Sequence, residues 1–66
     1  MRLRIDGLED SWPDGLSVGE ILRRRGDPAD QVLVELNGSL VRRDELERTF
    51  PKEGDVIEVI LPAHGG

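Results

Sequence analysis

Hydrophobic and polar residues alternate at the start of the chain. The segment MRLRI places Leu3 and Ile5 on one side and two arginines on the other, which is the two-residue period of a strand with one buried face. The dipeptide Asp6-Gly7 has the composition of a tight hairpin turn. We therefore expect a second, weakly patterned strand over residues 8–12. The pattern leaves open whether Trp12 covers the sheet edge or lies in solvent.

After Pro13 the spacing of apolar residues changes to that of a helix. Ser17 and Glu20 have the spacing of a capping box, in which each side chain binds a backbone N–H at the start of the helix. Apolar residues follow at positions 18, 21 and 22, which share one helical face. Three arginines at positions 23–25 suit the negative end of the helix dipole, and Gly26 suits a left-handed C-terminal cap. These signals predict a short helix of about two to three turns.

The pair Asn37-Gly38 predicts a second hairpin turn. Before it, the segment QVLVEL alternates, with apolar residues at positions 32, 34 and 36 on one face. After it, residues 39–41 have the length and composition of a short return strand. The two segments therefore predict a strand and its antiparallel partner.

The last third of the chain combines a helical turn with a strand. Leu46 and Phe50 lie four residues apart in RRDELERTF, so we expect both to enter the core from one side of a helical turn. The segment VIEVIL follows as the final strand, with Ile57, Val59 and Leu61 facing inwards. Because this strand and the one over 32–36 are far apart in sequence, we expect them to pair across a sheet rather than as a hairpin.

The same alternation assigns residues to the outer face of the sheet. Leu33, Val56 and Ile60 are expected to face away from the helix, together with Glu35 and Glu58. Scattered exposed apolar side chains are ordinary on protein surfaces. The alternative interpretation is a modest apolar patch, flanked by acids, that docks a partner beside the C-terminal tail.

The element order is strand, strand, helix, strand, short strand, helical turn, strand, and it predicts an α+β domain. We assign residues 1–61 to this domain and residues 62–66 to a flexible C-terminal tail. Pro62 has no N–H to donate to a strand ladder, and Gly65-Gly66 lose much backbone entropy on ordering. Fully extended, the tail has a reach of roughly 16–18 Å.

Composition restricts the possible functions. The chain has 66 residues, no cysteine and a formal net charge of −5. Disulfides and thiol chemistry are therefore excluded, and the acidic balance argues against a nucleic-acid binder, so we interpret the arginines at 23–25 and 42–43 as solvated or helix-end charges. No metal-ligand spacing or phosphate-binding loop is present. No apolar run suits a membrane span or a signal peptide, so we expect a cytoplasmic protein that is monomeric by itself.

The whole chain resembles a β-grasp, or ubiquitin-like, domain, and within that fold it resembles the ThiS/MoaD family of sulfur carriers. The most specific segments are VELNGSLVRRDEL at 34–46, KEGDVIEVI at 52–60 and the terminal Gly65-Gly66. The length of 66 residues suits the thiamine branch of the family. His64 stands where many tails of that branch carry a third glycine or an alanine. The resemblance implies a mixed sheet of four to five strands packed on one main helix.

The resemblance also implies that the chain is a protein substrate and not an enzyme. In such carriers a ThiF-like (E1-like) enzyme uses ATP to adenylate the C-terminal carboxylate, here that of Gly66. A sulfur donor such as a cysteine desulfurase then converts it to a thiocarboxylate, and a ThiG-like thiazole synthase accepts the sulfur. The carrier itself binds no cofactor. Gly65 lets the tail enter a narrow channel, and we interpret His64 as a solvated tail residue without a proton-transfer or metal role.

Other interpretations of this tail stay open at this point. The carrier does not encode its acceptor, so a molybdopterin precursor, a tRNA base or a cysteine precursor are alternatives to the thiazole of thiamine. A ubiquitin-like modifier, joined to target lysines through the same carboxylate, is an alternative of another class. An interaction domain with an inert tail is the last.

Overall fold

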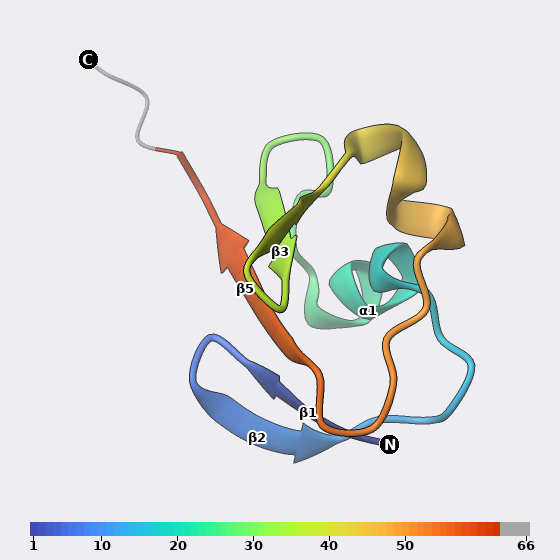
Figure 1. Ribbon diagram of the computed structural model, residues 1–66. Helices are drawn as coiled ribbons and strands as arrows, with labels where there is room; N and C mark the ends of the chain where they lie inside the picture. The colour runs from blue at the N-terminus through green and yellow to red at the C-terminus, as the bar shows by residue number, and fades with distance from the viewer. Residues whose placement is uncertain (63–66) are drawn as a thin grey trace.

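The computed structural model describes residues 1–62 of the chain, which form five strands, one α-helix and one 3₁₀-helix. In chain order these elements are β1 (Arg2–Ile5), β2 (Leu8–Ser11), α1 (Val18–Arg25), β3 (Leu33–Leu36), β4 (Ser39–Val41), the 3₁₀-helix η1 (Arg43–Arg48) and β5 (Val56–Ile60). The strands make one mixed sheet in the order β2-β1-β5-β3-β4, and α1 and η1 lie on one side of it (Figure 1). The expected α+β architecture is confirmed.

The central strand of the sheet is β5, which is flanked by β1 and β3. Ile57 of β5 pairs with Ile5 in parallel register on one side and with Leu36 in antiparallel register on the other. The predicted long-range pairing of the inner strands is therefore confirmed. Because β1 and β5 are parallel, the start of β1 and the end of β5 lie at opposite ends of the molecule (Figure 1).

The helix α1 begins and ends at its predicted signals. Ser17 Oγ accepts the backbone N–H of Glu20 at 3.1 Å, and Glu20 Oε1 accepts the backbone N–H of Ser17 at 3.2 Å. Gly26 closes the helix in the left-handed region with φ of 80°. Gly19 has a different role, because a Cβ at this position would run into the carboxylate of Glu47 on η1. The missing side chain leaves the space on the surface of α1 that this carboxylate occupies.

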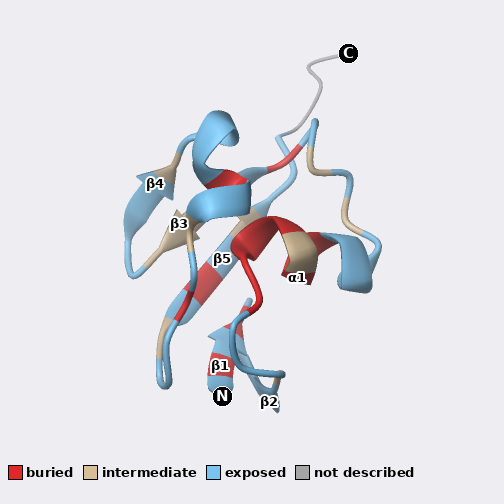
Figure 2. Cartoon of the chain, turned by 90° about the vertical axis from the view of Figure 1, so that its right-hand side faces the viewer, coloured by how far each residue is buried: buried red, intermediate tan, exposed pale blue. Residues whose placement is uncertain are grey.

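The core lies between α1 and the face of the sheet that α1 covers. Burial is concentrated in the N-terminal half of α1, at alternate positions along β1 and at one position in β5 (Figure 2). The buried apolar residues are Leu3, Ile5, Leu16, Val18, Ile21, Leu22, Val32, Val34, Leu46 and Ile57. Every element except the edge strands β2 and β4 thus contributes at least one side chain to a single core.

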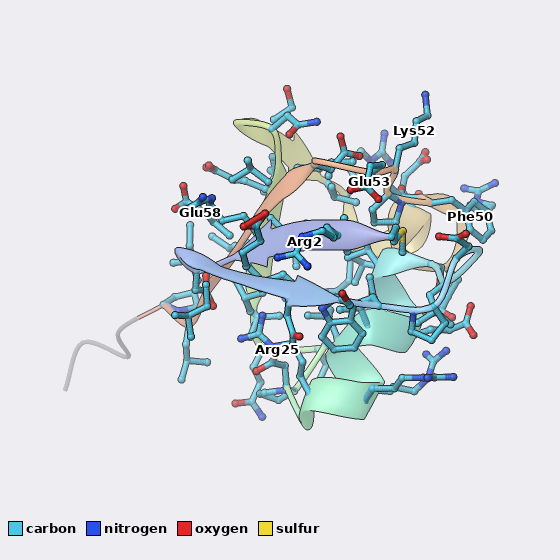
Figure 3. The ribbon with its side chains drawn as sticks, turned by 90° about the horizontal axis from the view of Figure 1, so that it is seen from below. Arg2, Arg25, Phe50, Lys52, Glu53 and Glu58 are labelled. Atoms are coloured by element: carbon cyan, nitrogen blue, oxygen red, sulfur yellow. The ribbon has the colours of Figure 1, made fainter. Side chains whose placement is uncertain are left out.

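Phe50, which we expected in the core, lies in solvent with 54% of its surface exposed. The prediction assumed α-helical spacing from Leu46, which is buried as expected. The helical turn is a 3₁₀-helix that ends at Arg48, and with three residues per turn the position four residues on does not share the face of Leu46. Figure 3 shows Phe50 pointing outwards, at the end of the molecule opposite to the C-terminal end of β5.

Leu61 is the second predicted core residue that is exposed, with 60% of its surface accessible. The strand β5 ends one residue earlier, at Ile60, whose partner Leu33 is the first residue of β3. No strand therefore lies beside Leu61, and alternation along β5 does not carry it into the core.

The sequence left open whether Trp12 covers the sheet edge or lies in solvent, and the structure shows that it is partly covered. Trp12 is half-buried and packs against the core where the chain leaves β2. The ammonium group of Met1 donates to the carbonyl oxygen of Trp12 at 2.6 Å, which ties this segment to the start of β1. Trp12 therefore covers one edge of the core.

Candidate functional site

The candidate site comprises the C-terminal end of β5 and the outer face of the sheet, which is the face turned away from α1. The strand β5 carries the chain through the centre of the sheet to Leu61 and Pro62 (Figure 1). The predicted tail residues His64, Gly65 and Gly66 lie outside the described residues. The described part of the site therefore shows where the tail begins and which surface surrounds its root.

The side chain of Asp6 holds the end of β5. Asp6 is the first residue of the β1–β2 turn and has φ of 52°. Its Oδ1 accepts the backbone N–H of Val59 at 2.8 Å, and its Oδ2 accepts from Arg25 Nη2 at 3.1 Å. The strand β1 ends at Ile5, so β1 does not continue beside Val59. The carboxylate of Asp6 accepts the N–H of Val59 in place of a strand partner. Asp6 thus fixes β5 close to the point where the tail begins.

Asn37 has the corresponding role at the start of β5. It is the first residue of the β3–β4 turn, also with φ of 52°. Its Oδ1 accepts the backbone N–H of Val56 at 2.9 Å, and its own N–H donates to the carbonyl of Val56 at 2.7 Å. The sequence predicted both turns but missed these contacts to β5. An Asp or Asn at the first position of each turn was the available signal, since these short side chains bind nearby backbone groups.

The three residues predicted to dock a partner lie on the outer face of the sheet. Leu33, Val56 and Ile60 have 43%, 37% and 39% of their surface exposed. Leu33 and Ile60 are directly opposite each other in the β3–β5 register. Their predicted placement is confirmed, and their role in docking stays a prediction.

Leu40 is a fourth apolar residue of this face, and the sequence interpretation missed it. It is 61% exposed and lies opposite Glu35 in the β3–β4 register. The register follows from the two-residue turn Asn37-Gly38, which sets Ser39 opposite Leu36, so the sequence did hold the signal. We call Leu33, Leu40, Val56 and Ile60 together the outer apolar patch.

The arginine clusters lie mainly in ion pairs. Arg23 donates from Nη1 and Nη2 to the two carboxylate oxygens of Glu47 at 2.8 and 2.9 Å. These hydrogen bonds hold the pKa of Glu47 below its ordinary value, and they raise the pKa of Arg23. Arg42 pairs with Asp44 at 3.2 Å. The pairs agree with our interpretation of these arginines as solvated or helix-end charges.

Two further features are absent from residues 1–62. In this part of the chain no helix has the length and hydrophobicity needed to cross a bilayer. The same residues contain no group of three or more side chains suited to holding a metal ion.

The topology and the position of the chain exit define the class of this protein. A five-stranded sheet with a parallel β1–β5 pair at its centre, packed on one main helix, with the chain leaving from the central strand, is a ubiquitin-like β-grasp domain. The sequence model of the ThiS family matches residues 3–66, and the chain belongs to the ThiS family. The fold and family that the sequence resemblance implied are confirmed.

Solved structures agree with this assignment. The crystal structure of the thiamine biosynthesis protein ThiS from Geobacter metallireducens is similar with a TM-score of 0.88 and 32% sequence identity, and the match covers 100% of both chains. The NMR solution structure of a thiamine biosynthesis protein from the same organism is similar with a TM-score of 0.78 and 32% identity. That match covers 100% of this chain and 88% of the other.

Proposed function

We propose that the chain is a sulfur carrier, and that its sulfur is used to build the thiazole of thiamine. The C-terminal carboxylate of Gly66 is the reactive group, and Gly65 and His64 belong to the tail that presents it. The chain is a co-substrate of other enzymes and has no active site of its own. ATP is consumed by a ThiF-like adenylating enzyme, and a ThiG-like thiazole synthase is the acceptor.

The observation that carries this proposal is the extent of the family match. The ThiS family model matches residues 3–66, so the matched region includes Gly65 and Gly66. The similar structure over the full length is that of a thiamine biosynthesis protein. A tail that begins at the end of the central strand also suits the presentation of a carboxylate to a site inside another protein.

The chemistry of the terminus explains why a partner enzyme is needed. A carboxylate is a poor electrophile, and attack of its oxygen on the α-phosphate of ATP releases pyrophosphate and forms an acyl-adenylate. A persulfide sulfur, supplied by a donor such as a cysteine desulfurase, then forms a bond to the acyl carbon while AMP leaves. Reductive cleavage of the S–S bond by a thiol leaves the thiocarboxylate on Gly66.

The test uses the purified chain, a ThiF-like enzyme, ATP and a persulfide-loaded cysteine desulfurase with a thiol reductant. Intact-protein mass spectrometry should show a gain equal to the difference between one sulfur and one oxygen atom. The product should then support thiazole formation by a ThiG-like synthase. An unchanged mass in the presence of an active enzyme would contradict the carrier function, and transfer to another acceptor only would contradict the thiamine assignment.

Variants of the terminus make this test specific to the carboxylate of Gly66. One added alanine after Gly66 moves the carboxylate by about 3.5 Å, and reaction geometry tolerates displacements of only about 1 Å. Adenylation should therefore fall by orders of magnitude, and deletion of Gly66 should have the same effect. His64→Ala is the matched control and should react at close to the rate of the parent. Equal adenylation of the extended chain would show that Gly66 is not the reactive residue.

A further inference from the structure

Two like charges face each other in the middle of the outer sheet face. Glu35 of β3 and Glu58 of β5 are directly opposite in the antiparallel register, a position in which like charges destabilise a sheet. In residues 1–62 neither carboxylate forms an ion pair with a basic side chain. Figure 3 shows Glu58 on the side of the sheet away from α1. The free protein therefore carries an uncompensated acidic pair in the centre of this face.

Neither of the two outward-facing arginines of β1 forms an ion pair with Glu35 or Glu58. Arg4 is opposite Val56 in the β1–β5 register, and Val56 lies two positions before Glu58 along β5. Its Nη1 donates to the carbonyl oxygen of Gly7 at 3.5 Å. Arg2 forms an ion pair with Glu9 of β2 at 3.5 Å. Neither arginine neutralises the acidic pair.

Apolar side chains surround the acidic pair on the same face. Leu33 and Ile60 form the next outward cross-strand pair on one side of it. Val56 precedes it on β5, and Leu40 lies beside Glu35 on β4. All four are 37% to 61% exposed. The surface thus has an anionic centre in an apolar frame, and it continues to the end of β5, where the tail begins.

We propose that the adenylating enzyme docks on this face by placing an arginine side chain between Glu35 and Glu58 and apolar side chains on the outer apolar patch. This inference rests on the proposed function for the identity of the enzyme. A guanidinium group has five donors in one plane and binds carboxylates in pairs of hydrogen bonds, so a single arginine is able to serve both glutamates. Docking then removes a repulsion that the free carrier contains.

The same charges argue against the other occupants of an apolar sheet face. A second copy of the chain, packed with its acidic pair opposite this one, would bring four carboxylates together. Nucleic acid and anionic membranes are repelled by this centre and by the net charge of −5. A protein surface that carries both a basic side chain and apolar side chains is the occupant that complements the two glutamates and the outer apolar patch.

The experiment compares Glu35→Gln and Glu58→Gln with the control Glu45→Gln, which removes an exposed carboxylate from η1 on the other side of the sheet. Binding of each full-length chain to the purified ThiF-like enzyme is measured at low and high salt, together with the thermal midpoint of the free chain. Each test variant should bind on the order of tenfold more weakly and depend less on salt than the parent. Its thermal midpoint should be equal to or higher than that of the parent, because a like-charge contact has been removed.

The possible results separate this inference from the proposed function. Unchanged binding of both test variants, with normal adenylation, would overturn the inference and leave the carrier function standing. Binding that depends on Glu35 and Glu58 without any adenylation would support the docking mode and overturn the carrier function. A lowered thermal midpoint in both variants, or self-association of the parent through this face in sedimentation, would also overturn the inference.

Discussion

At the scale of single residues, Asp6 and Asn37 each meet two requirements at once. Both have φ of 52°, a left-handed conformation in which Asp and Asn are enriched among residues with a side chain. Both also place a side-chain oxygen on a backbone N–H of β5, those of Val59 and Val56. The two turns therefore do more than connect neighbouring strands, since they hold the central strand at both ends.

Replacing Asp6 should show how much the end of β5 depends on this contact. Asp6→Ala removes the acceptor for the N–H of Val59 and places alanine at positive φ, so we expect a loss of about 1–3 kcal/mol in the free energy of unfolding. Asp6→Asn keeps an acceptor oxygen and tolerates the backbone conformation, so its loss should be clearly smaller. Denaturant unfolding gives both values. Equal losses would indicate that the ion pair with Arg25, and not the hydrogen bond to β5, is the important contact.

At the scale of elements, η1 is fastened to α1 by a charged contact. Arg23 near the end of α1 binds both carboxylate oxygens of Glu47 on η1. Gly19, one turn earlier on the helix, leaves the space that this carboxylate occupies. The contact is on the surface, with 58% and 59% of the two side chains exposed, so its contribution to stability is small.

The pH dependence of this contact has a definite sign. The pKa of Glu47 is lowered in the folded protein by the hydrogen bonds from Arg23. Its contribution to stability is therefore complete above the unfolded-state pKa and is lost as the pH falls through the lower folded-state pKa. Glu47→Gln should lower the thermal midpoint slightly at pH 7, and the difference from the parent should vanish well below about pH 4. Asp30→Asn is the control, because Asp30 is exposed and forms no ion pair within residues 1–62. A difference for Glu47→Gln that persists at low pH would contradict this account.

At the scale of the whole molecule, the two sides of the sheet have different roles. One side is closed by α1 and η1 and holds the core (Figure 1). The outer face exposes apolar side chains around the end of β5. This division allows the outer face to change without disturbing the fold. Substitutions on the outer face therefore test binding to a partner without a large change in the stability of the fold.

Charged substitutions in the outer apolar patch should affect binding and spare the fold. Leu33→Asp, Val56→Asp and Ile60→Asp should each weaken binding to the ThiF-like enzyme by about 1–3 kcal/mol, with little change in the thermal midpoint. Leu8→Asp is the matched control, because Leu8 is 76% exposed but pairs with the inward-facing Ile5 and so lies on the other side of the sheet. Calorimetric titration measures binding. Normal affinity of all three variants would remove the patch from the docking surface, and unfolding would contradict their exposure.

The sequence by itself determined the features that depend on short-range rules. The capping box of Ser17 and Glu20, the left-handed Gly26 and the two hairpin turns all formed as predicted. Each of them follows from the chemistry of a few neighbouring residues. The two-residue period also assigned inner and outer faces correctly within β1, β3 and β5, because successive side chains of a strand must point to opposite sides.

Only the tertiary structure decided where those elements end and what lies across from them. Phe50 is exposed because the preceding turn is a 3₁₀-helix, and Leu61 is exposed because β3 offers it no partner. The contact of Asp6 with β5 and the opposition of Glu35 and Glu58 depend on pairing between strands that are far apart in the chain. Local patterns do not encode such registers, because the free energy that selects them comes from burying the whole sheet face against α1 at once.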